Sequence, residues 1–521
     1  MVAPIETHKV RLHDWAAKNS ALFVILIINA IVIFVAYSLF LRTHFSADSY
    51  ATIVMSNKAF MEVHAGQGRW LNALIVFAIY KLGISIVFEQ QLGFLALAAS
   101  LIFCATFLVN CIKSSLKQVT LKHLLIIDTI VLVSFVNVFS AEIFYYPEST
   151  LLGAVGLLLE ILAVGILTKK WSISRMAVSC FLIILACSMY QIFFESFVIY
   201  SLCILLIQND FRFSKSALLN TIKVLSVALI GIIVCLGLSS LTITFFSLTP
   251  KIRTTLSLNP EIIIGNLKKI LQYHIELYKN ASGLLPGKGV LIWLICIVCV
   301  LGALPLVDTL RPGSKNRRKA IDFAYIAAIL IGCYIVIFAP HIVSPVFWPA
   351  PRTMSPLFSW LSLLAIIVVS LGDKQFVQSI VAAVCTIFLC INIIMIQQMA
   401  ADQLIVNAMD RQYAMEVLRK IESYELTTGN TVTRISIKQD ISPTYGYYDV
   451  TKTTTYDMGV RASVVSWSIG GLMYYVTGRS FIIDNMDDGV YLAHFDNKDW
   501  NTFIPEEQMF FSNDTLNLML Y

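Results

Sequence analysis

Long apolar stretches recur along most of the chain and limit what it can fold into. Runs of about 18 or more apolar residues are found repeatedly from Ala21 to Gln397, and about 20 residues of helix are enough to cross the core of a bilayer. Apolar residues make up 58% of the 521 residues and charged residues only 13%, against about 25% charged in an ordinary soluble domain. The sequence therefore predicts a polytopic α-helical membrane protein and excludes a soluble globular enzyme.

The apolar pattern divides into about eleven predicted membrane-spanning segments. Lys9, Arg11 and Lys18 precede the first segment, and they place the N-terminus in the cytoplasm because cytoplasmic loops are enriched in Lys and Arg. The later short loops follow the same alternation of basic and non-basic character. We expect the segments at residues 20–41, 91–112, 122–140, 150–168, 175–190, 192–207, 219–246, 289–308, 320–340, 354–371 and 376–396.

One further apolar stretch, residues 70–88, does not fit this alternation. Counting it as a span would move the basic loop that contains Lys113 and Lys122 to the outside. Tyr80, Lys81 and Gly83 lie near its centre, which is typical of a helix at the membrane interface or of a re-entrant helix. We therefore expect an interfacial helix within an outer loop of residues 42–90.

The last part of the chain differs from the rest in charge. Residues 397–521 carry 9 Lys+Arg and 16 Asp+Glu, a net charge of −7. Since the whole chain has a net charge of +6, residues 1–396 carry +13. Apolar spacing predicts a helix over residues 403–424, a strand over 432–437 and a second helix over 464–475. We expect a transmembrane module at 1–396, with a second outer loop at 247–288, and a small extracytoplasmic α/β domain at 397–521.

The basic surplus and the cysteines narrow the function classes. A positive surplus in a membrane protein is typical of loops beside anionic lipid, so nucleic-acid binding is not expected. All 11 cysteines lie in or beside the apolar stretches, where they are expected to behave as small buried hydrophobic residues. Neither a disulfide framework nor a metal-binding motif is visible.

The first outer loop contains an acidic residue close to the membrane. Asp48 follows the first segment by about seven residues and is followed directly by Ser49 and Tyr50. A carboxylate held beside a partly dry cavity can remove a proton from a hydroxyl group. Asp48 is therefore a candidate general base, and the alternative is a solvated loop carboxylate with no chemical role.

A second acidic cluster follows the third segment on the same predicted face. Glu142 and Glu148 flank Tyr145 and Tyr146 within one short turn. Two carboxylates wedged between apolar helices need water, partners or a ligand, so we regard both as candidate catalytic residues. The alternative is that they form structural ion pairs with Arg69 or Arg352.

Cations on the predicted outer face suggest a phosphate ligand, because a guanidinium presents a fork of donors that matches phosphate oxygens. The candidates are Arg69, Arg352, Lys251 and Arg253. The alternative is that most of these side chains are exposed to water and bind no ligand. Neighbouring aromatic and amide side chains are candidate substrate-binding residues: Tyr50, Tyr145, Tyr146, Tyr190, Gln191 and Trp348. For Tyr190 and Trp348 the alternative is an interfacial aromatic belt.

Several of these features together resemble a known family. The residues are Ser46-Ala47-Asp48-Ser49, Gly66-Gln67-Gly68-Arg69-Trp70, the segment 142–148, Tyr190-Gln191 and the exported C-terminus. The chain is similar over most of its length to the bacterial O-antigen glucosyltransferases, serotype-converting membrane enzymes of the GT-C superfamily. The family often has a pair of acids where this chain has Asp48-Ser49, and this departure weakens any expectation of a metal site in that loop.

The resemblance implies a function and roles for individual residues. Such enzymes transfer a sugar, typically glucose, from a polyprenyl-phosphate carrier to a cell-surface polysaccharide outside the cytoplasmic membrane. Asp48 matches the acid regarded as the base, Arg69 matches the Arg of the Gly-Arg element, and Glu142 and Glu148 match acids expected near the acceptor or the base. We expect an inverting transfer in the bacterial inner membrane.

Two alternatives and one cofactor question stay open at this point. The first alternative is a transporter or flippase of a lipid-linked substrate, for which Asp128 and Glu160 are the few acids within predicted spans. The second is a GT-C enzyme that uses another sugar, such as mannose or arabinose. The sequence predicts no particular cofactor, and it leaves open whether the enzyme needs a divalent cation, Mg²⁺ or Mn²⁺.

Overall fold

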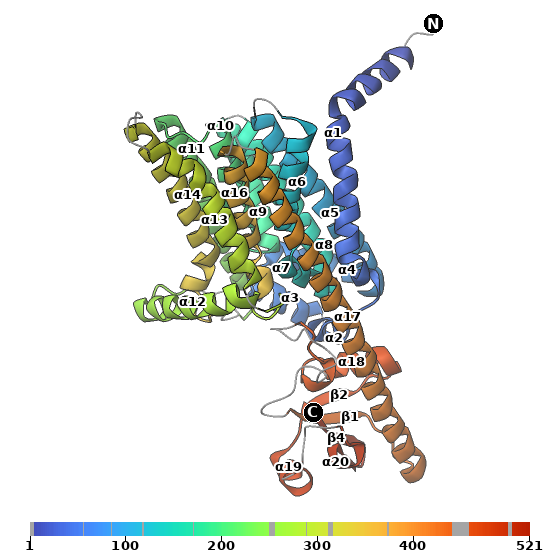
Figure 1. The fold of residues 1–521 in the computed structure, drawn as a ribbon. Helices are drawn as coiled ribbons and strands as arrows, with labels where there is room; N and C mark the ends of the chain where they lie inside the picture. Colours follow the sequence, from blue (N-terminus) through green and yellow to red (C-terminus); the bar gives the residue numbers. More distant parts are fainter. Residues whose placement is uncertain are drawn as a thin grey trace.

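The computed structural model shows a bundle of helices with a smaller unit at one end (Figure 1). It describes residues 5–55, 57–84, 86–116, 119–169, 171–249, 256–287, 289–310, 316–371, 375–439, 458–496, 498 and 503–520. The N-terminal end of α1 (Ile5–Tyr37) lies at the opposite end of the bundle from the smaller unit. The two ends of the chain are therefore separated by the length of the bundle.

Helices form wherever the apolar pattern predicts a membrane-spanning segment. After α1 and the 3₁₀ turn η1 (Ser38–Leu41), the elements up to the smaller unit are α2 (Ala47–Val54), α3 (Asn57–Gly66), α4 (Trp70–Lys81), α5 (Ile86–Ser115), α6 (Leu121–Phe135), α7 (Val138–Ala141), η2 (Glu142–Tyr145), α8 (Pro147–Lys169), α9 (Ile173–Met189), α10 (Phe193–Gln208), α11 (Lys215–Phe245), α12 (Pro260–Asn280), α13 (Val290–Leu310), α14 (Asn316–Val343), α15 (Pro351–Met354), α16 (Pro356–Leu371) and α17 (Gln375–Thr428).

Seven helices in the described part of the chain are long and apolar enough to cross a membrane. The count is eight if α6 and the segment that follows it, bent by 47°, form one span. Of the three remaining predicted segments, two form the shorter apolar helices α9 and α10, and the third forms α13, which is apolar over Val290–Val300. The prediction of a polytopic helical membrane protein is confirmed, whereas the count of eleven stays a prediction.

Two helices outside the predicted spans lie near the end that carries the smaller unit. Of the predicted interfacial segment 70–88, residues 70–81 form α4 and residues 86–88 begin α5, because Gly83 adopts a left-handed backbone (φ 69°) after the end of α4 at Lys81. This ending is typical, because glycine takes the conformation that closes a helix without steric cost. In the second predicted outer loop, α12 lies crosswise to the long helices (Figure 1) and is amphipathic, as an interfacial helix requires.

The longest helix, α17, runs from the bundle into the smaller unit. Its 54 residues contain neither glycine nor proline, so nothing in the sequence interrupts its hydrogen bonds where the apolar character ends. The predicted helix over 403–424 is confirmed as the distal part of α17 and not as a separate element. The predicted boundary at 396/397 lies inside this helix.

The smaller C-terminal unit contains a mixed four-stranded sheet in the order β2-β1-β4-β3. After α17, the elements of this unit are, in chain order, β1 (Arg434–Gln439), η5 (Ala462–Val464), α18 (Ile469–Thr477), β2 (Ile482–Asn485), α19 (Asp488–His494), α20 (Pro505–Gln508), β3 (Met509–Ser512) and β4 (Thr515–Leu520). β1 is parallel to both neighbours, and β3 is antiparallel to β4. The predicted α/β composition, strand and second helix of this unit are confirmed.

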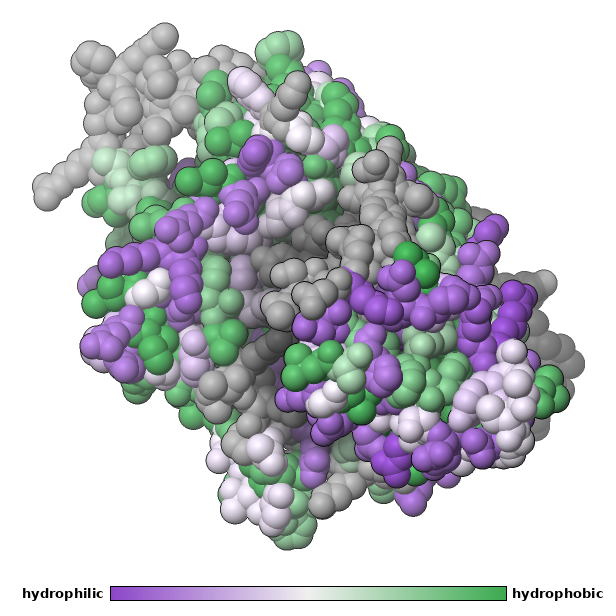
Figure 2. All heavy atoms as spheres, turned by 90° about the horizontal axis from the view of Figure 1, so that it is seen from below, coloured by the Kyte–Doolittle hydropathy of each residue, from purple (hydrophilic) through white to green (hydrophobic). Residues whose placement is uncertain are grey.

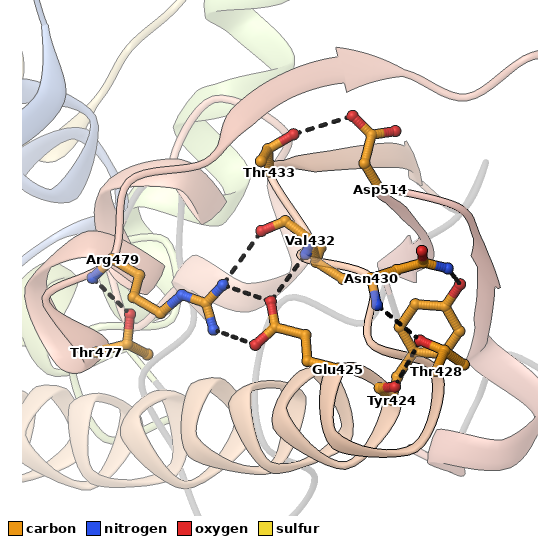
Figure 3. Close-up of polar contacts among 9 residues, drawn as sticks. All are labelled: Tyr424, Glu425, Thr428, Asn430, Val432, Thr433, Thr477, Arg479 and Asp514. Carbon is orange, nitrogen blue, oxygen red and sulfur yellow. Dashed lines mark hydrogen bonds and ion pairs between the residues drawn. The ribbon is translucent and has the colours of Figure 1, made fainter.

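A cluster of polar contacts ties the end of α17 to this sheet (Figure 3). Arg479 donates to both carboxylate oxygens of Glu425, at 3.0 and 2.8 Å. The same carboxylate accepts from the Val432 backbone N–H at 2.8 Å, and Arg479 also donates to the Val432 carbonyl. The next residue, Thr433, donates from its hydroxyl to the carboxylate of Asp514, which directly precedes β4, at 3.0 Å. The bidentate geometry fixes the direction in which the chain leaves α17.

The core of the C-terminal unit includes residues from the first outer loop. Phe45 and Tyr50 are fully buried and pack with apolar residues of α17, α18 and β4. Their rings lie 5.3 Å apart, and both contact the ring of Tyr475. The loop that contains Asp48 is therefore held by the C-terminal unit as well as by the helix bundle.

Candidate functional site

Asp48 lies in the first turn of α2, and the sequence itself fixes where this helix begins. Ser46 is the N-cap residue: its hydroxyl oxygen accepts from the Ser49 backbone N–H at 3.1 Å, and the Ser46 N–H donates to the Ser49 hydroxyl at 3.2 Å. This reciprocal pair is a capping box. The positive end of the helix dipole favours a charged carboxylate at this position. The Asp48 side chain is exposed, so a substrate can reach it.

One face of α17 holds the loop that precedes α2. Gln403 and Asn407 donate to the Phe45 carbonyl at 2.6 and 2.8 Å, and the Phe45 N–H donates to Asn407 at 2.7 Å. Three residues further on, Asp410 accepts from two backbone N–H groups of η5 (Ala462–Val464) at 3.0 and 3.3 Å. Spacings of four and three residues place these side chains on one helix face. The helix thereby brings two distant segments together.

A residue of the C-terminal unit contacts Asp48 directly. The indole N–H of Trp467 donates to Asp48 Oδ1 at 3.0 Å, although the two residues are 419 positions apart. Helix α18 packs against α2, and a Cβ atom on Gly471 would lie 1.7 Å from the Tyr50 carbonyl oxygen. This contact of Trp467 could not be predicted from sequence, because no local pattern links the residue to the first outer loop.

Glu148 is joined to the same helix through a serine. The Ser49 hydroxyl donates to Glu148 Oε2 at 2.8 Å, and the Ser46 and Ser49 hydroxyl oxygens are also 2.8 Å apart. Glu148 is 4% exposed, and its charge interacts unfavourably with that of Asp48. Two of the three predicted catalytic acids therefore lie together, one exposed and one buried.

The third predicted acid, Glu142, forms an ion pair with Arg352. The Arg352 guanidinium contacts one carboxylate oxygen of Glu142, and the Arg352 backbone N–H donates to the other at 2.5 Å. The guanidinium also donates to the Tyr146 hydroxyl at 3.0 Å and lies 5.0 Å from the centre of that ring. Glu142 is fully buried. The structural ion pair that was expected as the alternative to a catalytic role is therefore present for this residue.

Arg69 interacts electrostatically with Arg352 of this pair. Its guanidinium carbon is 4.3 Å from the centre of the Tyr190 ring, a cation–π contact. Burial and the charge of Arg352 lower the pKa of Arg69 from its usual value, whereas Tyr190, Tyr146 and Asp48 oppose this. Arg69 Nε is buried and has no hydrogen-bond partner in the described part of the protein. A guanidinium that has an unused donor and feels the charge of a second guanidinium favours an anionic ligand.

The Gly66–Trp70 segment docks onto the turn before α10. Gln191 donates to the Gln67 carbonyl at 3.0 Å. Gly68 has φ 77°, and a Cβ atom there would lie 2.8 Å from Gln191 Nε2. Only glycine meets both requirements without strain. The fit of Gly68 and Gln67 against Gln191 thus sets the position of Arg69.

The remaining predicted site residues are placed differently. Tyr50 and Tyr145 are fully buried, and the Tyr145 hydroxyl donates to the Met399 carbonyl at 2.7 Å. Trp348 is half-buried in the segment before Arg352. Lys251 and Arg253 lie outside the described residues.

The site lies where the bundle meets the C-terminal unit. Figure 2 shows this end from below, where polar side chains gather among apolar ones. Within the described ranges, no group of three or more His, Cys, Asp or Glu side chains is placed to hold a metal ion. The described groups include an exposed carboxylate and two guanidiniums that interact electrostatically, which suits removal of a proton and stabilisation of an anion.

Comparison with known proteins identifies a family. Residues 37–369 match the family model described as Glucosyl transferase GtrII, and this range contains every predicted site residue. No curated protein and no solved structure matches the chain. The matched range covers more than half of the 521 residues, and it confirms the family that the motifs of the first outer loop indicated. The chain therefore belongs to the Glucosyl transferase GtrII family and is a glycosyltransferase.

Proposed function

We propose that this enzyme transfers glucose from a polyprenyl-phosphate carrier to a lipid-linked or growing cell-surface polysaccharide such as O-antigen. The carrier explains why a glycosyltransferase needs so many apolar helices, because the prenyl tail stays in the bilayer while the phosphosugar reaches the surface. The observation that carries the proposal is that Arg69 interacts electrostatically both with the exposed carboxylate of Asp48 and with the guanidinium of Arg352.

The reaction is a single displacement with inversion at the anomeric carbon. Asp48 removes the proton from an acceptor hydroxyl, whose oxygen attacks the anomeric carbon of glucose. The bond between that carbon and the phosphate oxygen breaks, and polyprenyl phosphate leaves with the electron pair. Asp48 is preferred as the base because it is exposed, whereas Glu142 and Glu148 are buried and bound to Arg352 and Ser49.

Arg69 and Arg352 stabilise the negative charge that develops on the leaving phosphate. Donors placed in advance at the position of a developing charge give large rate effects. Tyr190 and Tyr146 hold the two guanidiniums from their ring faces, and Glu142 offsets part of the positive charge when no donor is bound. Helix α4 forms part of the entrance for the lipid carrier.

The site faces the outside of the cytoplasmic membrane. The basic N-terminal segment favours a cytoplasmic N-terminus, and its location opposite the C-terminal unit in Figure 1 supports an external C-terminal unit. A reporter fused after Tyr521 that is active only outside the cytoplasm should be active. A reporter active only inside would contradict this orientation.

A direct assay tests the donor. The full-length protein in lipid nanodiscs receives radiolabelled polyprenyl-phosphate glucose or, in parallel, radiolabelled nucleotide-linked glucose, together with lipid-linked polysaccharide. Label should enter polysaccharide only from the polyprenyl donor. Transfer only from the nucleotide sugar would refute the proposed donor, and movement of intact donor between leaflets without transfer would favour a flippase.

A further inference from the structure

Trp467 combines exposure with a fixed position beside the proposed base. Its side chain is 56% exposed, although its indole N–H is bound to Asp48 at 3.0 Å. Tryptophan pairs a large apolar face with one polar donor. The ring is therefore anchored at its polar atom while much of its surface remains open to solvent.

The segment around Trp467 is held firmly by its neighbours. The Ser468 hydroxyl donates to the carbonyls of Ala462 and Val465 at 2.5 and 3.1 Å. Ser468 itself is fully buried, and Leu472 on the next turn of α18 is also fully buried. Fixing these neighbours before binding reduces the entropy lost when a ligand is held.

Elsewhere in the described structure, a large exposed aromatic ring has a simpler explanation. Trp293 is 65% exposed and lies in α13, an apolar helix of the bundle, so lipid can cover it. Trp467 lies in the C-terminal unit, beyond the long apolar helices, and beside a carboxylate. Exposure of this ring to lipid tails does not explain its position.

We propose that Trp467 forms the acceptor-sugar subsite of the enzyme. The apolar C–H face of an acceptor hexopyranose stacks on the exposed indole, and the indole N–H holds the Asp48 carboxylate toward the acceptor hydroxyl. The C-terminal unit thereby contributes a substrate-binding residue to a site whose charged residues come from the first outer loop and the helix bundle. This inference rests on the proposed transfer reaction and extends it to the recognition of the acceptor.

The two parts of this role are separable by substitution. Trp467→Phe keeps a stacking ring and removes the N–H, whereas Trp467→Ala removes both. Trp467→Ala should raise the KM for acceptor at least tenfold with an unchanged KM for donor. Trp467→Phe should keep the acceptor KM within about threefold of wild type and lower kcat several-fold, because Asp48 loses its orienting donor.

The experiment uses full-length protein in nanodiscs, with Trp293→Ala as the matched control for loss of an exposed indole. Steady-state transfer is measured against both substrates, and binding of purified O-antigen polysaccharide is measured by calorimetry without donor. Trp293→Ala should behave as wild type in both measurements. Acceptor binding by Trp467→Ala equal to wild type would overturn the inference, as would equal increases of both KM values.

The binding measurement separates this inference from the proposed function. If wild-type protein binds the polysaccharide but does not transfer glucose from the polyprenyl donor, the donor assignment fails and the acceptor subsite is still judged by Trp467→Ala. If wild type does not bind the polysaccharide, the subsite is refuted. Thermal denaturation of each variant distinguishes loss of binding from loss of fold, and Trp467→Phe decides the outcome if Trp467→Ala does not fold.

Discussion

Replacing Arg352 with Met should destabilise the protein strongly, because it removes the cation that neutralises a buried carboxylate. Glu142 is fully buried, and the Arg352 side chain is 18% exposed. Removing one partner of a buried ion pair costs about 3–5 kcal/mol. The backbone N–H that also binds Glu142 is retained, so we expect the lower end, about 3 kcal/mol, or about a hundredfold in the unfolding equilibrium.

A double-mutant cycle tests this magnitude. The free energy of unfolding is measured in mixed detergent micelles for wild type, Arg352→Met, Glu142→Gln and the double variant. The double variant should regain about 2 kcal/mol relative to Arg352→Met, because no uncompensated charge is then buried. A coupling energy below about 0.5 kcal/mol would refute the reasoning.

The same four proteins separate stability from catalysis. The double variant should stay at least tenfold slower than wild type in transfer even though it is folded, because Arg352 no longer stabilises the leaving phosphate. Recovery of wild-type turnover by the double variant would show that the pair is purely structural.

Three further predictions concern neighbouring residues. Arg69→Lys should lower kcat/KM for the donor at least tenfold, since an ammonium group cannot reproduce a guanidinium fork; wild-type kinetics would reject a bidentate role. Gly471→Ala should lower the thermal midpoint and the activity together, because the added carbon would lie 1.7 Å from the Tyr50 carbonyl oxygen; an unchanged midpoint would show that α18 shifts freely. Burial and the charge of Arg69 lower the pKa of His64 to about 3. Below pH 6.5 the histidine is therefore protonated in the unfolded chain but not in the folded protein, and the free energy of unfolding falls as the pH drops from 6.5 toward 3. His64→Gln should reduce this pH dependence of the melting temperature, and an unchanged slope would contradict the assignment.

Much of the bundle could be predicted from sequence, because the lipid environment leaves few solutions for a long apolar stretch. Each predicted spanning segment is helical in the structure. The extent of α17 was harder to predict, since the charge balance changes near residue 397 and suggests a boundary. A helix needs no change of composition to continue, and only glycine, proline or a competing cap would have ended it.

The charged residues of the site were predictable one by one, whereas their pairing was not. Asp48, Arg69, Glu142 and Arg352 are conspicuous in sequence because charge is costly near a membrane. Their spacing along the chain does not reveal that Glu142 contacts Arg352, 210 positions away. The aromatic residues of the C-terminal unit are visible in the sequence, but nothing in the spacing of Trp467 indicates that it contacts Asp48, since this contact depends on how α17 brings the C-terminal unit to the first outer loop.

The central claim is that Asp48 is the base, and one kinetic comparison tests it directly. Asp48→Asn keeps the shape of the side chain and an oxygen that can accept from Trp467, but it cannot take a proton. With radiolabelled polyprenyl-phosphate glucose and polysaccharide in nanodiscs, kcat should fall at least a hundredfold, within the range expected for loss of a general base, while the Kd for donor stays within about threefold. Turnover within tenfold of wild type would contradict the claim and move the base to Glu148.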